Sequence, residues 1–367
     1  MSPVPSSLKH DRLALLPAAA QANPASCRTA LVEGGAALLD RILAQDLGPL
    51  WHHCLQSNGL LESLRPDTID ALHQARIAAT VGYLAQRATL DRIDRLFEAQ
   101  GIPYVAMKGS HVRESVYPDP ALRPASDIDL LIAPDDRRRA AAVLLDAGFT
   151  AHAEPANISH EATFSQGIVH IDLHWHILRP GRTRVDMTAE LLARRQRSNG
   201  LWRLSDPDTL FLMLIHPAFA KYVCSPNMGL ARVADFLLWI QKRTADWPEV
   251  LRLLRRAGLK TAAWTMLTWF RMLAPPDLHP LLDAWTRAVR PGRLRAAYLR
   301  QWLRHDLPTR WLERPFLIQF GFTLPLHDRP ADMLHAIRGL LQARKNRLRD
   351  MRLLLGEAQD GTPETTP

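Results

Sequence analysis

The chain has 367 residues, of which 47% are hydrophobic and 23% charged, a balance typical of soluble globular proteins that excludes wholesale disorder. This length is sufficient for two or three domains with a sizeable core. The net charge of +9 and the pI of about 9.9 favour an anionic partner such as a nucleotide, a nucleic acid or a lipid surface.

Cysteine usage and hydropathy favour the cytoplasm. Cys27, Cys54 and Cys224 stand at unrelated spacings without a C-x-x-C pair, which fits a reducing compartment better than a disulfide framework. A short apolar patch near the N-terminus is preceded by Asp11 and interrupted by Pro17, so a secretory signal is not expected. No stretch reaches 18 uncharged apolar residues, and we therefore predict a cytoplasmic protein without a membrane span.

The first expected elements along the chain are helices. Residues 1–28 carry several prolines among serines and alanines and are predicted to be weakly ordered. Apolar residues at helical spacing then indicate a helical N-terminal region over 29–100. Gly101, with a proline just beyond it, is a typical end for the last of these helices.

The segment 101–184 alternates between strand and helix patterns and predicts a compact mixed sheet. Strands are predicted over 103–107, 127–132, 149–154, 161–166 and 168–177, and helices over 110–117 and 134–149.

Helical periodicity returns after residue 184 and persists to 356. Eight of the ten tryptophans lie beyond residue 200, which indicates a packed helical domain over 185–356. Residues 357–367 are predicted to be a frayed tail. The expected fold class is α+β, with a small mixed β-sheet core between a helical N-terminal region and an all-α C-terminal domain.

Two aspartates one residue apart open the strand predicted over 127–132. Alternate side chains of a strand share a face, so Asp127 and Asp129 point the same way, about 6.6 Å apart along the chain, while the isoleucines and leucine between and after them point to the core. Two carboxylates held this close repel each other unless a cation lies between them. We therefore predict that Asp127 and Asp129 bind a divalent metal.

The strand predicted over 168–177 repeats this pattern around a third aspartate. Asp172 stands on its polar face together with His170, His174 and His176. If the two strands are neighbours, Asp172 completes a cluster of three carboxylates. Hard oxygen ligands of this kind favour Mg²⁺ or Mn²⁺ over zinc, and two such ions would clamp the attacking and leaving oxygens of a phosphoryl transfer.

A Lys-Gly-Ser turn precedes the acidic strand. Gly109 allows the backbone to approach a phosphate closely, and the N–H groups of the helix that follows present a positive dipole end to it. Ser110 adds a hydroxyl donor, and Lys108 and Arg123 are cations close enough in sequence to reach the same anion. These four residues are predicted to bind the phosphates of a nucleoside triphosphate (NTP).

Together, these motifs resemble the DNA polymerase beta-like nucleotidyltransferase superfamily. Within it, "MKGSHVRESVYPDPALRPASDIDLLI" followed by "VHIDLHWHI" is similar to an uncharacterised nucleotidyltransferase family that recurs in bacterial biosynthetic gene neighbourhoods, including those for modified peptides and surface polysaccharides. The likeness extends more loosely over residues 35–275.

The resemblance implies a metal-dependent enzyme that moves a nucleoside monophosphate from an NTP to an acceptor, either a small molecule, a peptide or a protein, and releases pyrophosphate. By this resemblance Asp127 and Asp129 would bind the metal ions, Asp172 would be the third ligand and a candidate base, and Gly109 and Ser110 would meet the nucleotide phosphates. Sixteen residues separate Ser110 from Asp127, more than in most of the superfamily, which puts a direct contact between Ser110 and the phosphates in doubt.

Several residues allow a second interpretation. His174 and His176 would suit a transition-metal site, but carboxylates dominate the cluster. We therefore predict that these histidines either support the metal ligands from behind or line the substrate pocket. Arg123 would alternatively form a salt bridge with Asp119 or Asp127. His216, on an apolar helix face, is expected to be a hydrogen-bonded core histidine.

Two other functions are compatible with the sequence. A non-catalytic nucleotide-binding or scaffold protein would keep the same fold without turnover. An RNA-tailing or RNA-binding protein would show salt-sensitive RNA affinity. The basic segment 337–352 would serve such binding, although a solvated helix face is the expected explanation of its charges.

Overall fold

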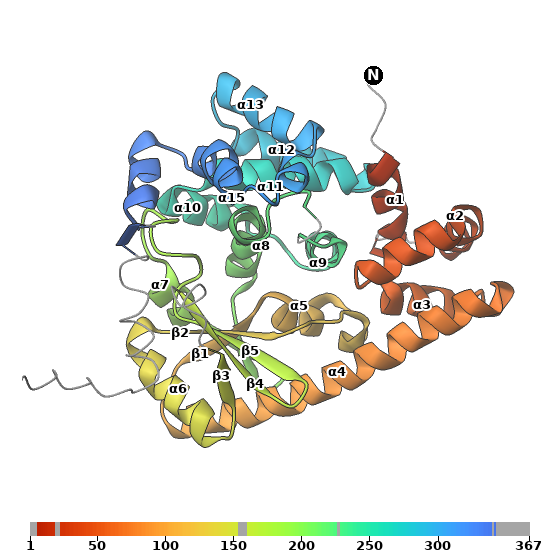
Figure 1. Cartoon of the computed structure of the whole chain (residues 1–367), viewed down its shortest axis with the longest axis horizontal. Coiled ribbons are helices and arrows are strands. Elements are labelled where there is room, and N and C mark those ends of the chain that lie inside the picture. Colours follow the sequence, from red (N-terminus) through yellow and green to blue (C-terminus); the bar gives the residue numbers. More distant parts are fainter. Residues whose placement is uncertain (1–5, 19–22, 153–159, 226–227, 340, 343–367) are drawn as a thin grey trace, which may run out of the picture.

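The computed structural model describes residues 6–18, 23–152, 160–225, 228–339 and 341–342. A seven-stranded sheet lies against the long helix α4 (Pro66–Ala99). The helices later in the sequence gather on the side of the sheet that faces away from α4 (Figure 1). This architecture confirms the predicted α+β class, in which helical parts flank a mixed sheet.

The N-terminal region is helical from residue 6 in its described part. Its first helices are α1 (Ser6–Ala14), α2 (Pro24–Ala44) and α3 (Gly48–Gln56). The prediction of weak order is therefore wrong for 6–14 and 24–28. The prolines that suggested it do not interrupt these helices, since Pro24 occupies the first position of α2, where its missing N–H costs nothing.

The sheet is mixed, as predicted. Its strands are β1 (Tyr104–Met107), β2 (Ile128–Ile132), β3 (Thr150–His152), β4 (Glu161–Gln166), β5 (Val169–His174), β6 (Gln196–Ser198) and β7 (Leu201–Arg203). They lie in the order β3-β4-β5-β2-β1-β7-β6. The pairs β2–β5 and β1–β7 are parallel and the other neighbours are antiparallel.

The structure differs from the predicted strands at two places. The strand expected to run to residue 177 ends at His174, so Ile177 joins the hydrophobic core on the other side of the sheet from Ile171 and Leu173. The region after residue 185 is not entirely helical, because the β6–β7 hairpin extends the sheet. Asn199 and Gly200, both with positive φ, form its turn, and an Asn-Gly pair is a hairpin signal.

The two faces of β2 contact different layers. Ile128, Leu130 and Ile132 pack in a core with α4 and with α6 (Arg137–Asp146). Leu131 points to the other face, into the larger core formed with α5 (Lys108–Val116) and the helices that follow the sheet. Asp129 shares this second face with Leu131.

The helices that follow β5 gather on the side of that second face (Figure 1). They are α7 (Thr188–Ala193), α8 (Asp206–Ala220), α9 (Leu230–Lys242), α10 (Trp247–Ala257), α11 (Lys260–Leu273), α12 (His279–Ala288), α13 (Arg293–Arg304), α14 (Leu307–Arg310), α15 (Pro315–Leu317) and a helical stretch over 330–339. Most of the basic segment 337–352 and the whole tail 357–367 lie outside the described residues. Within the described ranges, no helix has the length and apolar character needed to cross a membrane.

A buried histidine joins α5 to α8 and gives the fold a pH dependence. The His111 Nε2 atom lies 3.1 Å from the Thr209 hydroxyl, and burial lowers the pKa of His111 to about 3. An unfolded histidine titrates near pH 6.5. The unfolded chain therefore takes up a proton that the folded chain excludes, so the stability contribution of the neutral ring is complete above about pH 6.5 and is lost progressively as the pH falls toward 3.

We expect His111→Gln to remove up to about 1.4 kcal/mol per pH unit from the slope of unfolding free energy against pH between 6.5 and 4.5. Urea unfolding curves at several pH values would measure this slope. The exposed His305→Gln is the matched control and should leave the slope unchanged. Equal slopes in wild type and His111→Gln would show that His111 is not the titrating group.

Candidate active site

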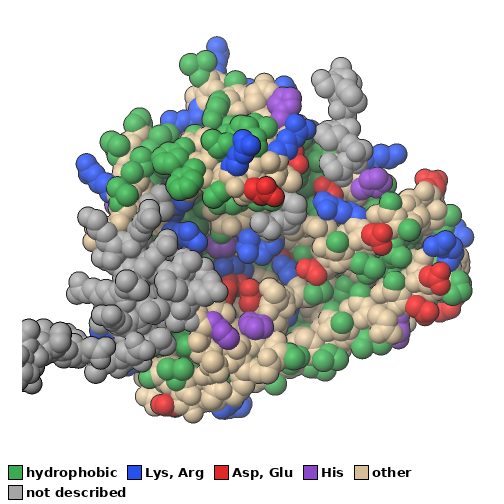
Figure 2. Space-filling view, viewed as in Figure 1, with side chains coloured by type: hydrophobic (Ala, Val, Ile, Leu, Met, Phe, Trp, Pro, Cys, Tyr) green, Lys and Arg blue, Asp and Glu red, His purple; other side chains and the backbone are tan. Residues whose placement is uncertain are grey.

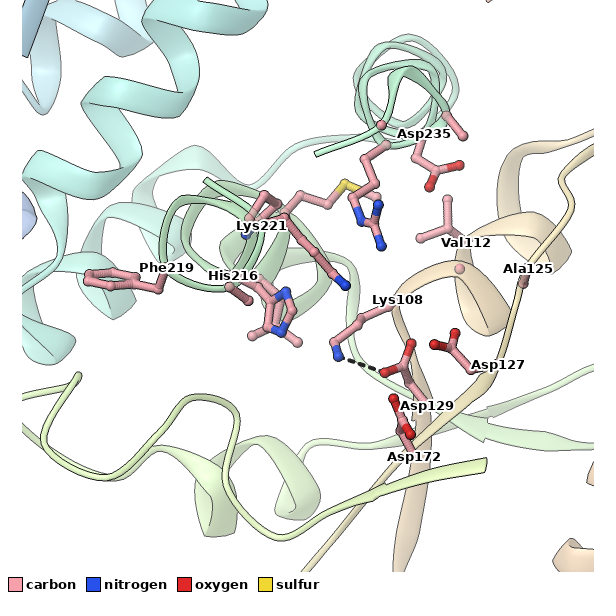
Figure 3. Close-up of a pocket in the computed structure, with 18 of the residues that line it drawn as sticks. Lys108, Val112, Ala125, Asp127, Asp129, Asp172, His216, Phe219, Lys221 and Asp235 are labelled. Carbon is pink, nitrogen blue, oxygen red and sulfur yellow. Dashed lines mark hydrogen bonds and ion pairs between the residues drawn. The ribbon is translucent and has the colours of Figure 1, made fainter. Parts of the chain in front are cut away.

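Three carboxylates meet on two neighbouring strands. Asp127 directly precedes β2, and within the parallel pair of strands Asp129 of β2 stands opposite Asp172 of β5. Burial raises the pKa of Asp127, and the charges of Asp129 and Asp172 raise it further. Figure 3 shows the three side chains gathered at one side of a pocket. The structure therefore brings together the three aspartates that the sequence singled out.

Asp129 is held by two nitrogen donors. Its Oδ1 lies 2.6 Å from the Lys108 Nζ and 2.9 Å from the His174 Nε2. Burial acts to raise the pKa of Asp129, but the charge of Lys108 and the hydrogen bond from His174 outweigh it and hold the pKa well below its usual range. Asp129 is therefore charged at neutral pH.

The backbone at the strand-to-helix corner directs Lys108 toward the acids. Lys108 follows β1 and has a φ of 52°, a left-handed conformation that is uncommon for a residue with a side chain. The residue in the left-handed region is thus Lys108 and not Gly109. Such strain is found preferentially at functional sites, where the surrounding structure maintains it.

His174 extends this network to a fourth acidic residue. Its ring is completely buried, and its Nδ1 lies 3.0 Å from the Glu161 Oε2 in β4. Burial and the charge of Lys108 act to lower the pKa of His174, but its contacts with Asp129 and Glu161 raise it overall. His174 thus contacts Asp129 directly, as a buried partner behind the acidic cluster.

A cavity of about 560 Å³ opens over the carboxylates, between the sheet, the start of α5 and the helices α8 and α9. Figure 2 shows basic and acidic side chains close together in the hollow at the centre of the molecule. The charged residues that line the cavity are Asp46, Asp127, Asp129, Glu161, Asp172 and Asp235, together with Lys108, Arg123, Arg179, Arg182, Lys221 and Arg232. Mixed charges of this kind suit a ligand that brings both phosphates and cations.

Arg123 lines the cavity, but its charge is already paired. Its Nη2 donates to the Asp235 Oδ2 at 2.8 Å, its Nε lies 3.1 Å from both carboxylate oxygens, and both side chains are buried. Gly109 lies beside it, since a Cβ there would come 3.4 Å from the Arg123 Nη2. Arg123 is thus paired, as the alternative interpretation held, but its partner is Asp235 on α9 and not Asp119 or Asp127.

Three of the predicted site residues are not among the described residues that line the cavity. The Ser110 side chain is buried and lies 3.4 Å from the Asp127 carbonyl oxygen, so it supports the acidic segment from behind and is not among the described residues that line the cavity. His174 and His176 are also outside that lining, and the His176 ring lies 2.9 Å from Asp186 because β5 ends before it. His216 on α8 is buried, as expected, and also lines the cavity.

The donor atoms around Asp129 fit a divalent metal ion. Asp129, Asp172 and His174 each offer one ligand atom within 4.8 Å of the others, and His160, Glu161 and His174 form a second such group. Asp127 belongs to neither group in the part of the chain that the structure describes, although its carboxylate faces the same pocket (Figure 3). Carboxylates are the ligands that Mg²⁺ and Mn²⁺ prefer.

Other lining residues were missed because they come from distant segments. Glu161 opens the strand that pairs with β5, and Arg179 and Arg182 follow β5. Asp235 could have been found from the sequence, because it is an acidic residue within the apolar stretch of α9. Such a residue requires a buried partner of opposite charge.

The comparison with protein families gives the class of this protein. Residues 36–275, more than half of the chain, match a family of nucleotidyltransferases. The chain belongs to the family described as uncharacterised nucleotidyltransferase, which confirms the resemblance found in the sequence. None of the curated proteins matches this chain. Membership implies a nucleotide as substrate.

Proposed function

We propose that this protein is a metal-dependent nucleotidyltransferase that moves a nucleoside monophosphate from an NTP to an acceptor hydroxyl or phosphate and releases pyrophosphate. The observation that carries this proposal is the parallel register that sets Asp129 beside Asp172, with Asp127 directly before the same strand. The family match supports the reaction class.

Asp127, Asp129 and Asp172 would hold one or two Mg²⁺ or Mn²⁺ ions. When bound, such ions neutralise phosphate oxygens and stabilise the charge that develops at the α-phosphate. Gly109, which lines the cavity where α5 begins, would lie beside the phosphates and leave room for them.

Asp172 is the candidate base. Burial raises the pKa of Asp172, which makes its carboxylate a better proton acceptor than an exposed one, and the Thr163 hydroxyl donates to it at 2.7 Å and fixes its orientation. Asp172 would take the proton of the acceptor hydroxyl while the acceptor oxygen bonds to the α-phosphorus. The bond from that phosphorus to the bridging oxygen breaks, and pyrophosphate leaves.

Tracing two labels tests the proposal. The purified protein is incubated with Mg²⁺, a cell extract and each NTP in turn, labelled at either the α- or the γ-phosphate. We expect the α-label to move to a component of the extract and the γ-label to appear in pyrophosphate, with both signals lost when EDTA removes the metal. Nucleotide binding without transfer would contradict the enzyme and favour the non-catalytic alternative.

A further inference from the structure

Arg182 is a buried cation whose charge has no acidic partner in the part of the chain that the structure describes. Only 5% of its surface is exposed, although it contributes to the lining of the cavity. Its Nη2 donates to the Gln319 side-chain oxygen at 2.6 Å, whereas its buried Nη1 has no hydrogen-bond partner among the described residues. A buried charge is costly unless an opposite charge compensates it, so this position favours an anion.

The groups around Arg182 add to this preference. The Nε2 of Gln319 is a second buried donor without a partner among the described residues, and Gln319 also lines the cavity. Burial, reinforced by the charge of Arg179, lowers the pKa of Arg182 to about 10, which leaves it positive at neutral pH. Phe219, 5.5 Å from the Arg182 guanidinium, holds it by a cation–π contact.

Arg182 and the Gly109 turn belong to different sides of the carboxylate cluster. Arg179 and Arg182 follow β5, the strand of Asp172, and line the cavity together with Glu161, which opens β4 on the other side of β5 from β2. On the other side, toward β2 and β1, Gly109 at the start of α5 lies beside Arg123, which stands in the loop before β2. Cations therefore lie on both sides of the aspartates.

This arrangement matters because the attacking and leaving oxygens of a phosphoryl transfer lie roughly in line, on opposite sides of the reacting phosphorus. If pyrophosphate leaves on the side of Gly109, the acceptor enters on the side of Asp172. We propose that Arg182, with Gln319 and Arg179, forms an anion-binding subsite for a phosphate or carboxylate group of the acceptor. This inference rests on the proposed function and adds to it the chemical class of the acceptor, which is an anionic molecule.

Calorimetric titration of a simple anion tests the subsite. The protein is first saturated with Mg²⁺ and the α,β-methylene analogue of the NTP that labelling identifies, and inorganic phosphate or acetate is then added. We expect one of the two anions to bind to this complex and Arg182→Gln to weaken that binding by about tenfold or more. Binding of phosphate alone or of acetate alone would tell which group the acceptor carries.

Two controls keep the test decisive. Arg184→Gln, in the same loop, removes a cation that pairs with Asp332 and lies outside the described lining of the cavity, so it should leave anion binding unchanged. An unchanged affinity of Arg182→Gln for the nucleotide analogue would show that the variant is folded.

The inference is overturned if the bound analogue excludes both anions, because Arg182 would then belong to the nucleotide site, or if Arg182→Gln binds them as the wild type does. Failure of the wild type to bind the analogue is a different result, and it would refute the proposed function itself.

Discussion

Asp129→Asn is expected to lower the rate of nucleotidyl transfer by about 10³-fold, measured as pyrophosphate release at saturating NTP. Asp129 is at the centre of the site. It contacts Lys108 and His174 and stands opposite Asp172 in the pair of strands β2 and β5. An amide of the same shape removes the negative charge that a metal ion and the phosphates require. We also expect weaker binding of Mn²⁺, measured by electron paramagnetic resonance.

A companion variant separates catalysis from folding. Asp129→Asn also leaves the charge of Lys108 without its nearest carboxylate, which lowers stability. Asp172→Asn avoids this, because its main partner is the Thr163 hydroxyl, which donates equally well to an amide oxygen. We expect a similar loss of rate with little loss of stability.

Asp135→Asn is the control for these variants, since Asp135 is exposed and lies beyond the far end of β2. Turnover by Asp172→Asn within tenfold of wild type would refute the role given to this carboxylate.

The acidic cluster was predictable from the sequence because it depends on the alternation of polar and apolar residues within each strand. In a strand, side chains alternate between faces, so the sequence around Asp127 and Asp129 and that around Asp172 each indicated which face is polar. The pairing of β2 with β5 was a condition of that prediction, and the structure meets it. The helical parts were predictable for the same reason, since their apolar spacing repeats over many residues.

The rest of the site depends on contacts between distant segments. The ion pair of Arg123 with Asp235 spans 112 positions, and no local pattern specifies it. The hairpin of β6 and β7 has strands of three residues, too short for an alternating pattern to stand out. The left-handed backbone of Lys108 was also not predictable, since the glycine next to it is the residue expected to adopt that conformation.

Among the substitutions predicted to affect folding, breaking the Arg123–Asp235 pair is expected to lower the free energy of unfolding most. The pair joins the loop before β2 to α9 and so holds the sheet against the helices that close the cavity. Both side chains are at least nine-tenths buried. Asp235→Asn would leave the Arg123 guanidinium charged without a carboxylate, and we expect the free energy of unfolding in urea to fall by about 3–5 kcal/mol.

An exposed ion pair provides the matched control. The side chains of Arg271 and Asp283 are 35% and 45% exposed, so Asp283→Asn should cost less than about 1 kcal/mol. The penalty of Asp235→Asn arises from an isolated buried charge. Because the Tyr117 hydroxyl also donates to Asp235, at 2.9 Å, the combined replacement Arg123→Met, Asp235→Leu and Tyr117→Phe should recover much of it. If Asp235→Asn cost no more than Asp283→Asn, water would be reaching Arg123, and the guanidinium would then be free to bind the nucleotide phosphates, as the sequence alone predicted.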